Sequence, residues 1–142
     1  MGLVRLDTAT VAECGTLALL NRGLILAERS DNTMHYDALV DRMRGFLEGN
    51  YAAWLFRVED MVVGYCLVDM SSTPRYLRHF FIVEAYRGRG YGRAAFDALC
   101  DTLGAAALDI DVLDWNTAGA AFWRRMGFVP RYTRMRRPEA PR

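Results

Sequence analysis

The sequence predicts an α/β protein whose mixed β-sheet is covered by helices on both faces. Apolar residues at helical spacing alternate along the chain with short runs rich in β-branched and aromatic residues. These segments follow the order β-α-α-β-β-β-α-β-α-β. Helices between strands imply parallel pairing, and direct strand-to-strand connections imply antiparallel pairing. A twisted central sheet with both pairings is therefore expected.

The first third of the chain reads as one strand and two helices. Leu3–Leu6 is a short strand. Thr10 and Glu13 have the spacing of a capping box, which predicts a helix that continues to about Ala27. A second helix is predicted over Met34–Glu48, where apolar residues again recur at helical spacing.

The middle of the chain reads as three strands and a helix. Tyr51–Val58 and Met61–Met70 are separated by two residues, the spacing of a hairpin. Gly64 in the second of these strands marks a bulge or a close backbone approach. Tyr76–Val83 is a third long strand, and a helix follows over Gly90–Leu103.

The last third predicts a strand, a helix and a final strand. Ala107–Leu113 is the strand, and Ala118–Met126 is a helix capped by Asn116. Phe128–Met135 is the final strand. No repeat, linker or second domain is visible, so residues 1–142 are expected to form one domain.

Composition excludes several classes of function. The net charge of +1 argues against a protein that grips nucleic acid electrostatically. All 18 basic residues are arginines, which excludes a Schiff-base lysine and the lysine of a phosphate-binding P-loop. An arginine-rich C-terminal stretch leaves a nucleic-acid binder as a remote alternative, which steeply salt-dependent DNA binding would revive.

The sequence does not predict a metal site, a membrane span or a disulfide framework. Cys14, Cys66 and Cys100 are widely spaced, and His35 and His79 lie far apart, so neither a disulfide framework nor a metal site is expected. No apolar run approaches the ~20 residues of a membrane span, and the N-terminus has no apolar signal core. A cytoplasmic location without membrane attachment is expected.

The stretch Arg87-Gly88-Arg89-Gly90-Tyr91-Gly92-Arg93 predicts an anion site. It joins a strand to a helix, so free backbone N–H groups and the positive end of the helix dipole meet there. Three arginines add charge, which favours a polyphosphate. A dinucleotide fingerprint fails because Arg93 stands where the third spaced glycine is needed, and a Walker loop needs a lysine. A solvated, glycine-capped turn is the structural alternative.

Two motifs together resemble the GNAT (GCN5-related N-acetyltransferase) superfamily. Arg87-x-x-Gly90-x-Gly92 resembles its acetyl-CoA signature between strand and helix. The stretch from Asn116 to Phe128 is similar to its second motif, N-x-x-A-x-x-x-Y-x-x-x-G-F. The resemblance covers nearly the whole chain. It implies an acyl-CoA N-acyltransferase fold with a splayed pair of parallel strands.

The resemblance also implies how acetyl-CoA, the expected cosubstrate, is held. Pantetheine would pair with backbone on the exposed edge of the first splayed strand, and the pyrophosphate would sit on the glycine turn. Asn116 would contact pantetheine, although it also reads as a plain helix N-cap. The expected cofactor-binding residues are Phe80, Phe81, Ile82, Arg87, Gly88, Arg89, Gly90, Tyr91, Gly92, Arg93 and Asn116.

The implied reaction is direct attack of a primary amine on the acetyl thioester in a ternary complex. Asp111 stands where ribosomal-protein N-terminal acetyltransferases have a glutamate that draws the proton from the amine, which makes it the candidate base. The competing interpretation is that Asp109 and Asp111 form the solvent face of an alternating strand. Glu84 and His79 are weaker candidates.

Trp123 departs from the second motif, where a tyrosine usually protonates the leaving thiolate. An indole N–H cannot serve as that acid. Either Trp123 lines the thioester pocket while Tyr91 or Tyr132 supplies the proton, or the chain is a non-catalytic or weakly active acyl-CoA-binding module.

The acceptor is a small-molecule or peptide amine that the sequence does not identify further. In this fold, residues 21–50 and 69–76 would shape its pocket. Four acidic residues there read equally as partners for a cationic amine and as solvated helix faces; they are Asp31, Asp37, Asp41 and Glu48. Many family members close the sheet with two strands, whereas only 128–142 follow Gly127. Either the sheet ends early or another subunit covers its edge, as in a homodimer.

Overall fold

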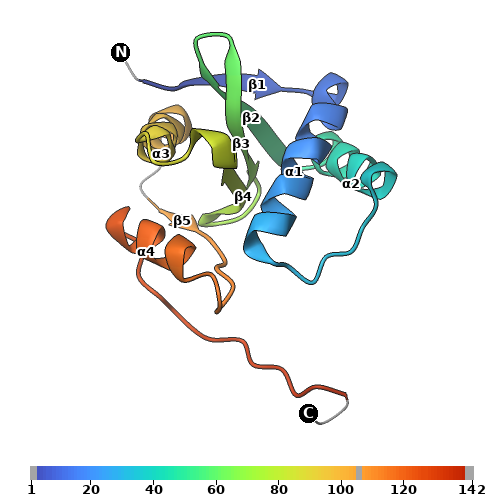
Figure 1. Ribbon diagram of the computed structural model, residues 1–142, viewed down its shortest axis with the longest axis vertical. Coiled ribbons are helices and arrows are strands. Elements are labelled where there is room, and N and C mark those ends of the chain that lie inside the picture. Colours follow the sequence, from blue (N-terminus) through green and yellow to red (C-terminus); the bar gives the residue numbers. More distant parts are fainter. Residues whose placement is uncertain (1–2, 105–106, 140–142) are drawn as a thin grey trace.

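The computed structural model describes residues 3–104 and 107–139, in which helices and a five-stranded sheet alternate (Figure 1). The strands are β1 (Arg5–Ala9), β2 (Tyr51–Val58), β3 (Met61–Asp69), β4 (Arg75–Ile82) and β5 (Leu108–Asp109). The helices are α1 (Cys14–Glu28), α2 (Tyr36–Glu48), α3 (Tyr91–Leu103) and α4 (Thr117–Arg125).

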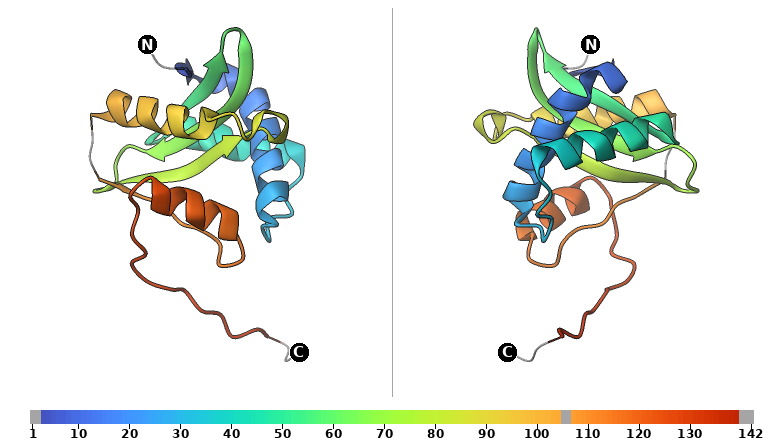
Figure 2. Two further views of the ribbon diagram at one scale, coloured as in Figure 1. Left: turned by 60° about the vertical axis from the view of Figure 1, so that its left-hand side comes forward. Right: turned by 90° about the vertical axis from the view of Figure 1, so that its right-hand side faces the viewer.

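The sheet is mixed, as the sequence predicts. Its spatial order is β1-β2-β3-β4-β5, and the first three pairings are antiparallel. β4 and β5 pair in parallel across the α3 crossover. Helices α1 and α2 lie on one side of the sheet and α3 and α4 on the other (Figures 1 and 2), which confirms the two-faced covering.

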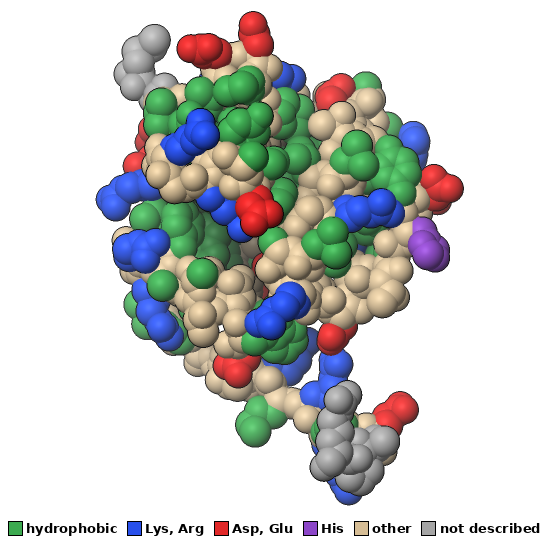
Figure 3. Space-filling model, viewed as in Figure 1, with side chains coloured by type: hydrophobic (Ala, Val, Ile, Leu, Met, Phe, Trp, Pro, Cys, Tyr) green, Lys and Arg blue, Asp and Glu red, His purple; other side chains and the backbone are tan. Residues whose placement is uncertain are grey.

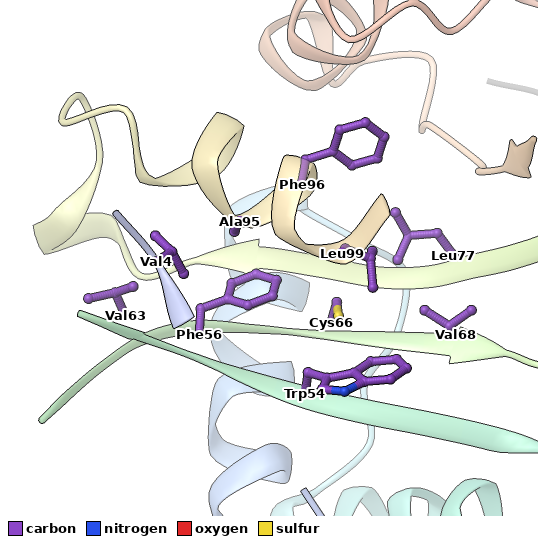
Figure 4. Close-up of a cluster of buried hydrophobic side chains, with 10 residues drawn as sticks. All are labelled: Val4, Trp54, Phe56, Val63, Cys66, Val68, Leu77, Ala95, Phe96 and Leu99. Atoms are coloured by element: carbon purple, nitrogen blue, oxygen red, sulfur yellow. The ribbon is translucent and has the colours of Figure 1, made fainter. Parts of the chain in front are cut away.

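Two hydrophobic clusters fill the two sides. Alternate residues of β2 and β3 point to opposite faces. One cluster joins Trp54, Phe56 and Cys66 to the apolar face of α3, and Figure 4 shows these side chains pointing toward Ala95 and Leu99. The other cluster lies under α1 and α2, with Leu17, Met43, Leu55, Tyr65 and Leu67 among its buried members.

The capping box forms at the start of the helical segment, one turn ahead of α1. Thr10 N donates to Glu13 Oε1 at 2.7 Å, and Ala12 N donates to Thr10 Oγ1 at 3.4 Å. These bonds begin a 3₁₀ turn over Val11–Glu13, and α1 follows from Cys14. The boundaries of the other helices and of β2, β3 and β4 agree with the expected ones within about two residues, whereas β1 is shifted toward Arg5–Ala9.

Gly64 combines both features that the sequence predicts for it. The β2–β3 register shifts beside it, where Phe56 faces Gly64 but Arg57 faces Val62. A Cβ at Gly64 would overlap the carbonyl oxygen of Phe81 on β4. β4 has an irregularity in its pairing with β3. Leu67 faces His79 whereas Val68 faces Leu77, so Arg78 is the extra, unpaired residue of β4.

Two strand predictions near the C-terminus are wrong. The strand expected over Ala107–Leu113 is only Leu108–Asp109, and Phe128–Met135 is extended without a ladder partner among the described residues. Alternating polarity favours an extended backbone, but a strand also needs a neighbour for its N–H and C=O groups. Beyond Asp109 the chain no longer pairs with β4. At the start of the other segment, Phe128 N donates to Trp123 O at 3.0 Å, which is a bond at the end of α4 and not a strand pairing.

Candidate functional site: an open strand pair beside a glycine turn

β4 and β5 separate almost as soon as they meet. Their parallel pairing consists of Arg75 with Leu108 and Tyr76 with Asp109, whereas β4 continues to Ile82. Val83 N donates to Val63 O on the β3 side. Because backbone direction alternates along a strand, Ile82 and Phe80 turn their N–H and C=O groups to the opposite edge. On that edge Arg87 Nε occupies Ile82 O, and β5 no longer pairs beyond Tyr76, so the remaining groups of Phe80 and Ile82 can meet an extended, amide-bearing chain.

The glycine turn at the end of β4 prepares the start of α3. Gly88 and Gly90 have φ angles of +77° and +81°, which L side chains rarely adopt. Gly90 is the N-cap residue, and the first helical bond runs from Ala94 N to Gly90 O. The N–H groups of Tyr91, Gly92 and Arg93 therefore point out of the helix end without helical partners, which suits a phosphate.

The three arginines of this turn differ in their surroundings. Arg87 Nε donates to Ile82 O at 2.9 Å, and its guanidinium lies 5.4 Å from the Phe81 ring centre. Arg89 lies 6.0 Å from the ring centre of Tyr86. In the described chain, neither these two nor Arg93 has a carboxylate oxygen within 4.0 Å. Arg87 Nε thus stabilises the end of β4. The Nη groups of Arg87 and the guanidiniums of Arg89 and Arg93 remain available for an anion.

Asn116 caps α4, and its neighbour ties the loop to α1. Asn116 Oδ1 accepts the N–H of Gly119 at 3.0 Å, which leaves its amide NH₂ group to donate elsewhere. Trp115 Nε1 donates to Glu28 O at 2.8 Å. The segment after β5 consequently crosses to the C-terminal end of α1 before α4 begins (Figure 1).

Asp111 lies just beyond β5 and meets a residue of β4 that sequence reasoning missed. Tyr76 O–H donates to Asp111 Oδ2 at 2.9 Å. Burial, and then this carboxylate, raise the pKa of Tyr76 above its ordinary value, so the phenol stays neutral. Asp111 is exposed and Asp109 beside it is exposed too. No pattern in the sequence linked Tyr76 to Asp111, because 35 positions separate them.

Trp123 belongs to an aromatic cluster. Its ring centre lies 5.1 Å from Phe80, 5.5 Å from Phe96 and 5.2 Å from Phe128. The same side chain lines the groove beside β5. Of the two tyrosines considered as replacement acids, Tyr91 is half-buried in the first turn of α3, and Tyr132 is 78% exposed in the C-terminal segment.

A broad groove contains Asp111 and Trp123 and reaches the C-terminal half of α1 and Arg42 of α2, whereas Phe80–Ile82, Asn116 and the glycine turn do not line it. It runs along β4, the 110–115 loop, α4 and the C-terminal segment. Figure 3 shows a hollow between the α3–α4 side and the α1 side, with hydrophobic side chains in its wall. Of the four acidic residues considered for the acceptor pocket, Asp31 lines this groove; Asp37, Asp41 and Glu48 are exposed on α2 outside it.

The groove also contains a polar network that the sequence did not reveal. Asn21 and His79 are buried, with exposed fractions of 1% and 8%. Tyr65 O–H and His79 Nδ1 share a hydrogen bond of 3.0 Å, and Arg42 Nη2 donates to Asn21 Oδ1 at 2.9 Å. Burial, together with Arg42 and Arg78, lowers the pKa of His79 to about 3. His79 is therefore neutral and already hydrogen-bonded, and Glu84 is exposed in a 3₁₀ turn.

The described residues contain no group of three or more His, Cys, Asp or Glu side chains arranged to hold a metal ion. In the same part of the chain, no helix is both long and apolar enough to cross a membrane.

Solved structures of low sequence identity share this fold. A possible acetyltransferase from Clostridium difficile 630 superposes with a TM-score of 0.76 at 16% identity, over 99% of both chains. An acetyltransferase from Thermus thermophilus gives 0.73 at 20% identity, over 91% of this chain and 90% of its own. A ribosomal-protein-alanine N-acetyltransferase from Brucella melitensis biovar Abortus 2308 gives 0.72 at 13% identity, over 95% and 99%.

Sequence comparison extends the likeness. The uncharacterized protein ML0378 of Mycobacterium leprae (strain TN) is 36% identical over 85 residues, which are 54% of this chain and 24% of that protein. This chain thus matches about a quarter of that relative's length. A profile described as the acetyltransferase (GNAT) family matches residues 21–128. Because that span contains the open strand pair, the glycine turn and α4, the chain belongs to the GNAT family of acetyltransferases.

Proposed function

We propose that this protein is an N-acetyltransferase that transfers the acetyl group of acetyl-CoA to a primary amine. The observation that carries the proposal is the early separation of β5 from β4, the strand that leads into the glycine turn. An open strand edge suits the amides of pantetheine, and a helix N-terminus with two positive-φ glycines suits a pyrophosphate. These two features lie end to end along one element, which matches the extended shape of a coenzyme A molecule.

The residues present fit that molecule. Backbone of Phe80 and Ile82, in the segment Phe80–Ile82, would hold pantetheine. The N–H groups from Tyr91 to Arg93, with Arg89 and Arg93, would hold the pyrophosphate. The Asn116 amide would add a donor beside the thioester. Since Arg87 already binds Ile82 O, its Nη groups would reach the phosphates while its Nε stays on the strand.

Asp111 is the proposed base. An amine attacks a thioester carbonyl only in its neutral form, and lysine-like amines have pKa values near ~10.4. The Asp111 carboxylate would accept the amine proton, directly or through water, while Tyr76 O–H holds that carboxylate from the neighbouring strand. The departing thiolate needs little help, because its pKa near ~8.5 makes it a fair leaving group.

A direct experiment tests the proposal. Purified protein is incubated with acetyl-CoA and a panel of primary amines, and the release of free thiol and the mass of the product are followed. We expect amine-dependent thiol release and an N-acetylated product. Tight binding of acetyl-CoA with no turnover on any amine would contradict the enzyme assignment.

Trp123 supports a second candidate function, an acyl-CoA-binding module without catalysis. This indole occupies the usual tyrosine position and packs among Phe80, Phe96 and Phe128. An indole cannot protonate a thiolate. Both functions require binding of acyl-CoA, so calorimetric binding combined with the turnover assay separates them.

A further inference from the structure

Arg42 and Arg78 form a pair of cations on the acceptor side of the groove. Arg42 comes from α2 and Arg78 is the extra residue of the β4 bulge. Both line the groove that also contains Asp111. Their guanidinium carbons lie 5.6 Å and 5.2 Å from the centre of the same Phe46 ring. Two residues distant in sequence thus bring positive charge to one place.

Neither arginine is neutralised within the described chain. The ion pairs of those residues are Arg57 with Asp7 and Arg136 with Asp31. Arg42 instead donates to the neutral Asn21 amide, and Arg78 Nε donates to Tyr51 O–H at 2.8 Å. Aromatic rings supply the remaining contacts. Arg42 is half-buried and Arg78 is exposed beside it on the same Phe46 ring, and burial and then the charge of Arg78 lower the pKa of Arg42, so a bound anion would relieve the repulsion between the two cations.

Each guanidinium keeps donors free for such an anion. A guanidinium has five N–H donors, and Arg78 commits only its Nε while Arg42 commits one Nη2 hydrogen. Aromatic rings flank both guanidiniums, and Arg78 also lies 5.3 Å from the ring centre of Tyr76. A planar carboxylate matches a held guanidinium in shape and charge.

Tyr76 connects this pair to the proposed base. Its ring contacts Arg78, and its O–H binds Asp111. The groove therefore presents a carboxylate for an amine on one side of Tyr76 and guanidiniums for an anion on the other. An acceptor that carries both groups would meet complementary charge at both ends.

We propose that Arg42 and Arg78 bind a carboxylate of the acceptor, so that the preferred substrates are amines that also carry a carboxylate. The inference rests on the proposed acetyltransferase function and names its substrate class. It departs from the expectation that acidic residues of the first two helices select a cationic amine. Of those four acidic residues, only Asp31 lines the groove, and it lies 3.8 Å from Arg136.

Matched acceptors test the proposal. The series glycine, β-alanine, 4-aminobutyrate and 5-aminopentanoate is compared with the corresponding primary amides by kcat/KM. We expect at least one acid to exceed its amide about 10- to 100-fold, the range of charge-assisted hydrogen bonds. Equal values for every acid and amide pair would overturn the proposal. So would a stronger preference for aminoalkylphosphonates of the same lengths.

Variants assign the preference to the two arginines. Arg78→Gln and Arg42→Gln should each move the acid-to-amide ratio toward one, and Arg78→Lys should restore part of it. Arg44→Gln on the exposed face of α2 is the matched control and should keep the wild-type ratio. Thermal unfolding confirms that each variant folds. An unchanged ratio in folded Arg78→Gln and Arg42→Gln proteins would contradict the assignment.

A binding measurement separates this inference from the proposed function. N-acetyl-4-aminobutyrate and its primary amide are titrated into the protein by calorimetry in the presence of coenzyme A. Tighter binding of the acid, lost in Arg78→Gln, supports the carboxylate site even if no acetyl transfer occurs. Transfer to amines without any such difference supports the function and rejects the carboxylate site.

Discussion

At the scale of single residues, the site depends on contacts between side chains that lie far apart in sequence. Asp111 is exposed and outside a strand, so a solvated carboxylate would be the default interpretation. Its hydrogen bond from the neutral Tyr76 phenol gives it a fixed place beside the open strand pair. The contact gives Asp111 a partner on β4, and its role as the base stays a proposal.

Replacing Asp111 tests that role. Asp111→Asn keeps the shape and an acceptor for Tyr76 but removes the basic carboxylate. We expect kcat/KM to fall about 10²- to 10⁴-fold, the usual contribution of a general base, and its pH dependence to change. Asp109→Asn, at the other exposed carboxylate of this segment, is the matched control. An unaltered rate and pH profile in Asp111→Asn would exclude Asp111 as the base.

Trp123→Tyr restores the phenol that family members usually have. We expect kcat to rise, because a phenol can protonate the leaving thiolate. The free energy of unfolding should fall by about 1–3 kcal/mol as the aromatic cluster loses volume. Trp123→Phe gives a matched loss of packing without the hydroxyl. If kcat is no higher in Trp123→Tyr than in Trp123→Phe, another group already acts as the acid.

His79 makes stability depend on pH. The unfolded chain takes up a proton on this imidazole near pH 6.5, whereas the folded chain does so only near pH 3. The unfolded state binds more protons between these values, so stability should decrease as pH falls from about 6.5 to about 3. The slope is at most about 1.4 kcal/mol per pH unit.

Urea unfolding at a series of pH values measures this slope. His79→Gln removes the titrating group but keeps a hydrogen-bonding side chain beside Tyr65. We expect its stability to vary less with pH across the same window. Parallel curves for the variant and the wild type would show that His79 is not the responsible group.

At the scale of elements, the glycine turn shows how backbone geometry prepares an anion site. Gly90 has a φ of +81° at the N-cap of α3, and a Cβ there would meet open space. Its requirement is therefore conformational: the backbone must turn so that the first N–H groups of α3 face outward. Gly92 has a different reason, because a Cβ there would lie 3.2 Å from Phe122 of α4.

Gly90→Ala tests the conformational requirement alone, because the added Cβ meets open space and only the positive φ is unfavourable. The left-handed conformation costs an L-residue about 1–2 kcal/mol, so we expect lower stability together with weaker binding of acetyl-CoA. Gly45→Ala within α2 is the control: it also meets open space but lacks a positive φ, and it should stabilise the helix by about 0.5–1 kcal/mol. Thermal unfolding and calorimetric titration measure both effects. Unchanged acetyl-CoA affinity in Gly90→Ala would argue against the turn as the phosphate site.

At the scale of the whole molecule, the β5 edge of the sheet has no further strand beside it among the described residues. β5 is two residues long, and Phe128–Met135 is extended without pairing to the described strands. Three large apolar side chains of that segment are exposed: Val129, Tyr132 and Met135, at 78%, 78% and 89%. An extended segment with exposed apolar groups beside a short edge strand favours association with another chain.

We propose that this edge pairs with a second copy of the chain, which gives a homodimer. Light scattering after gel filtration should give twice the chain mass of 16.1 kDa. The double variant Val129→Asp with Tyr132→Asp should be monomeric, whereas Leu26→Asp, at another exposed apolar position, should not change the mass. A wild-type mass equal to one chain would contradict the dimer.

The sequence by itself determined the class of fold and the family, and it predicted the location of the proposed cofactor site. These depend on local signals: helical and strand periodicity, the capping box, and glycines at fixed offsets in the two motifs. The bulge and the close backbone approach at Gly64 were also predicted locally, because a glycine inside a strand usually marks one of these two features. The same local rules also predicted a strand after α3 and a strand after α4. The first prediction was too long, and the second was wrong. Strand formation depends on a partner, and a partner is not encoded in the strand's own residues.

Only the tertiary structure decided which distant residues meet. Three contacts join distant parts of the chain: Tyr76 with Asp111, Trp115 with Glu28, and Arg42 with Arg78 around the Phe46 ring. Their positions follow from the β4 bulge, the departure of the chain from β5, and the packing of α2 over β4. Because such pairings arise from the three-dimensional arrangement and not from spacing along the chain, the residues of the proposed acceptor site could be brought together only in the folded molecule.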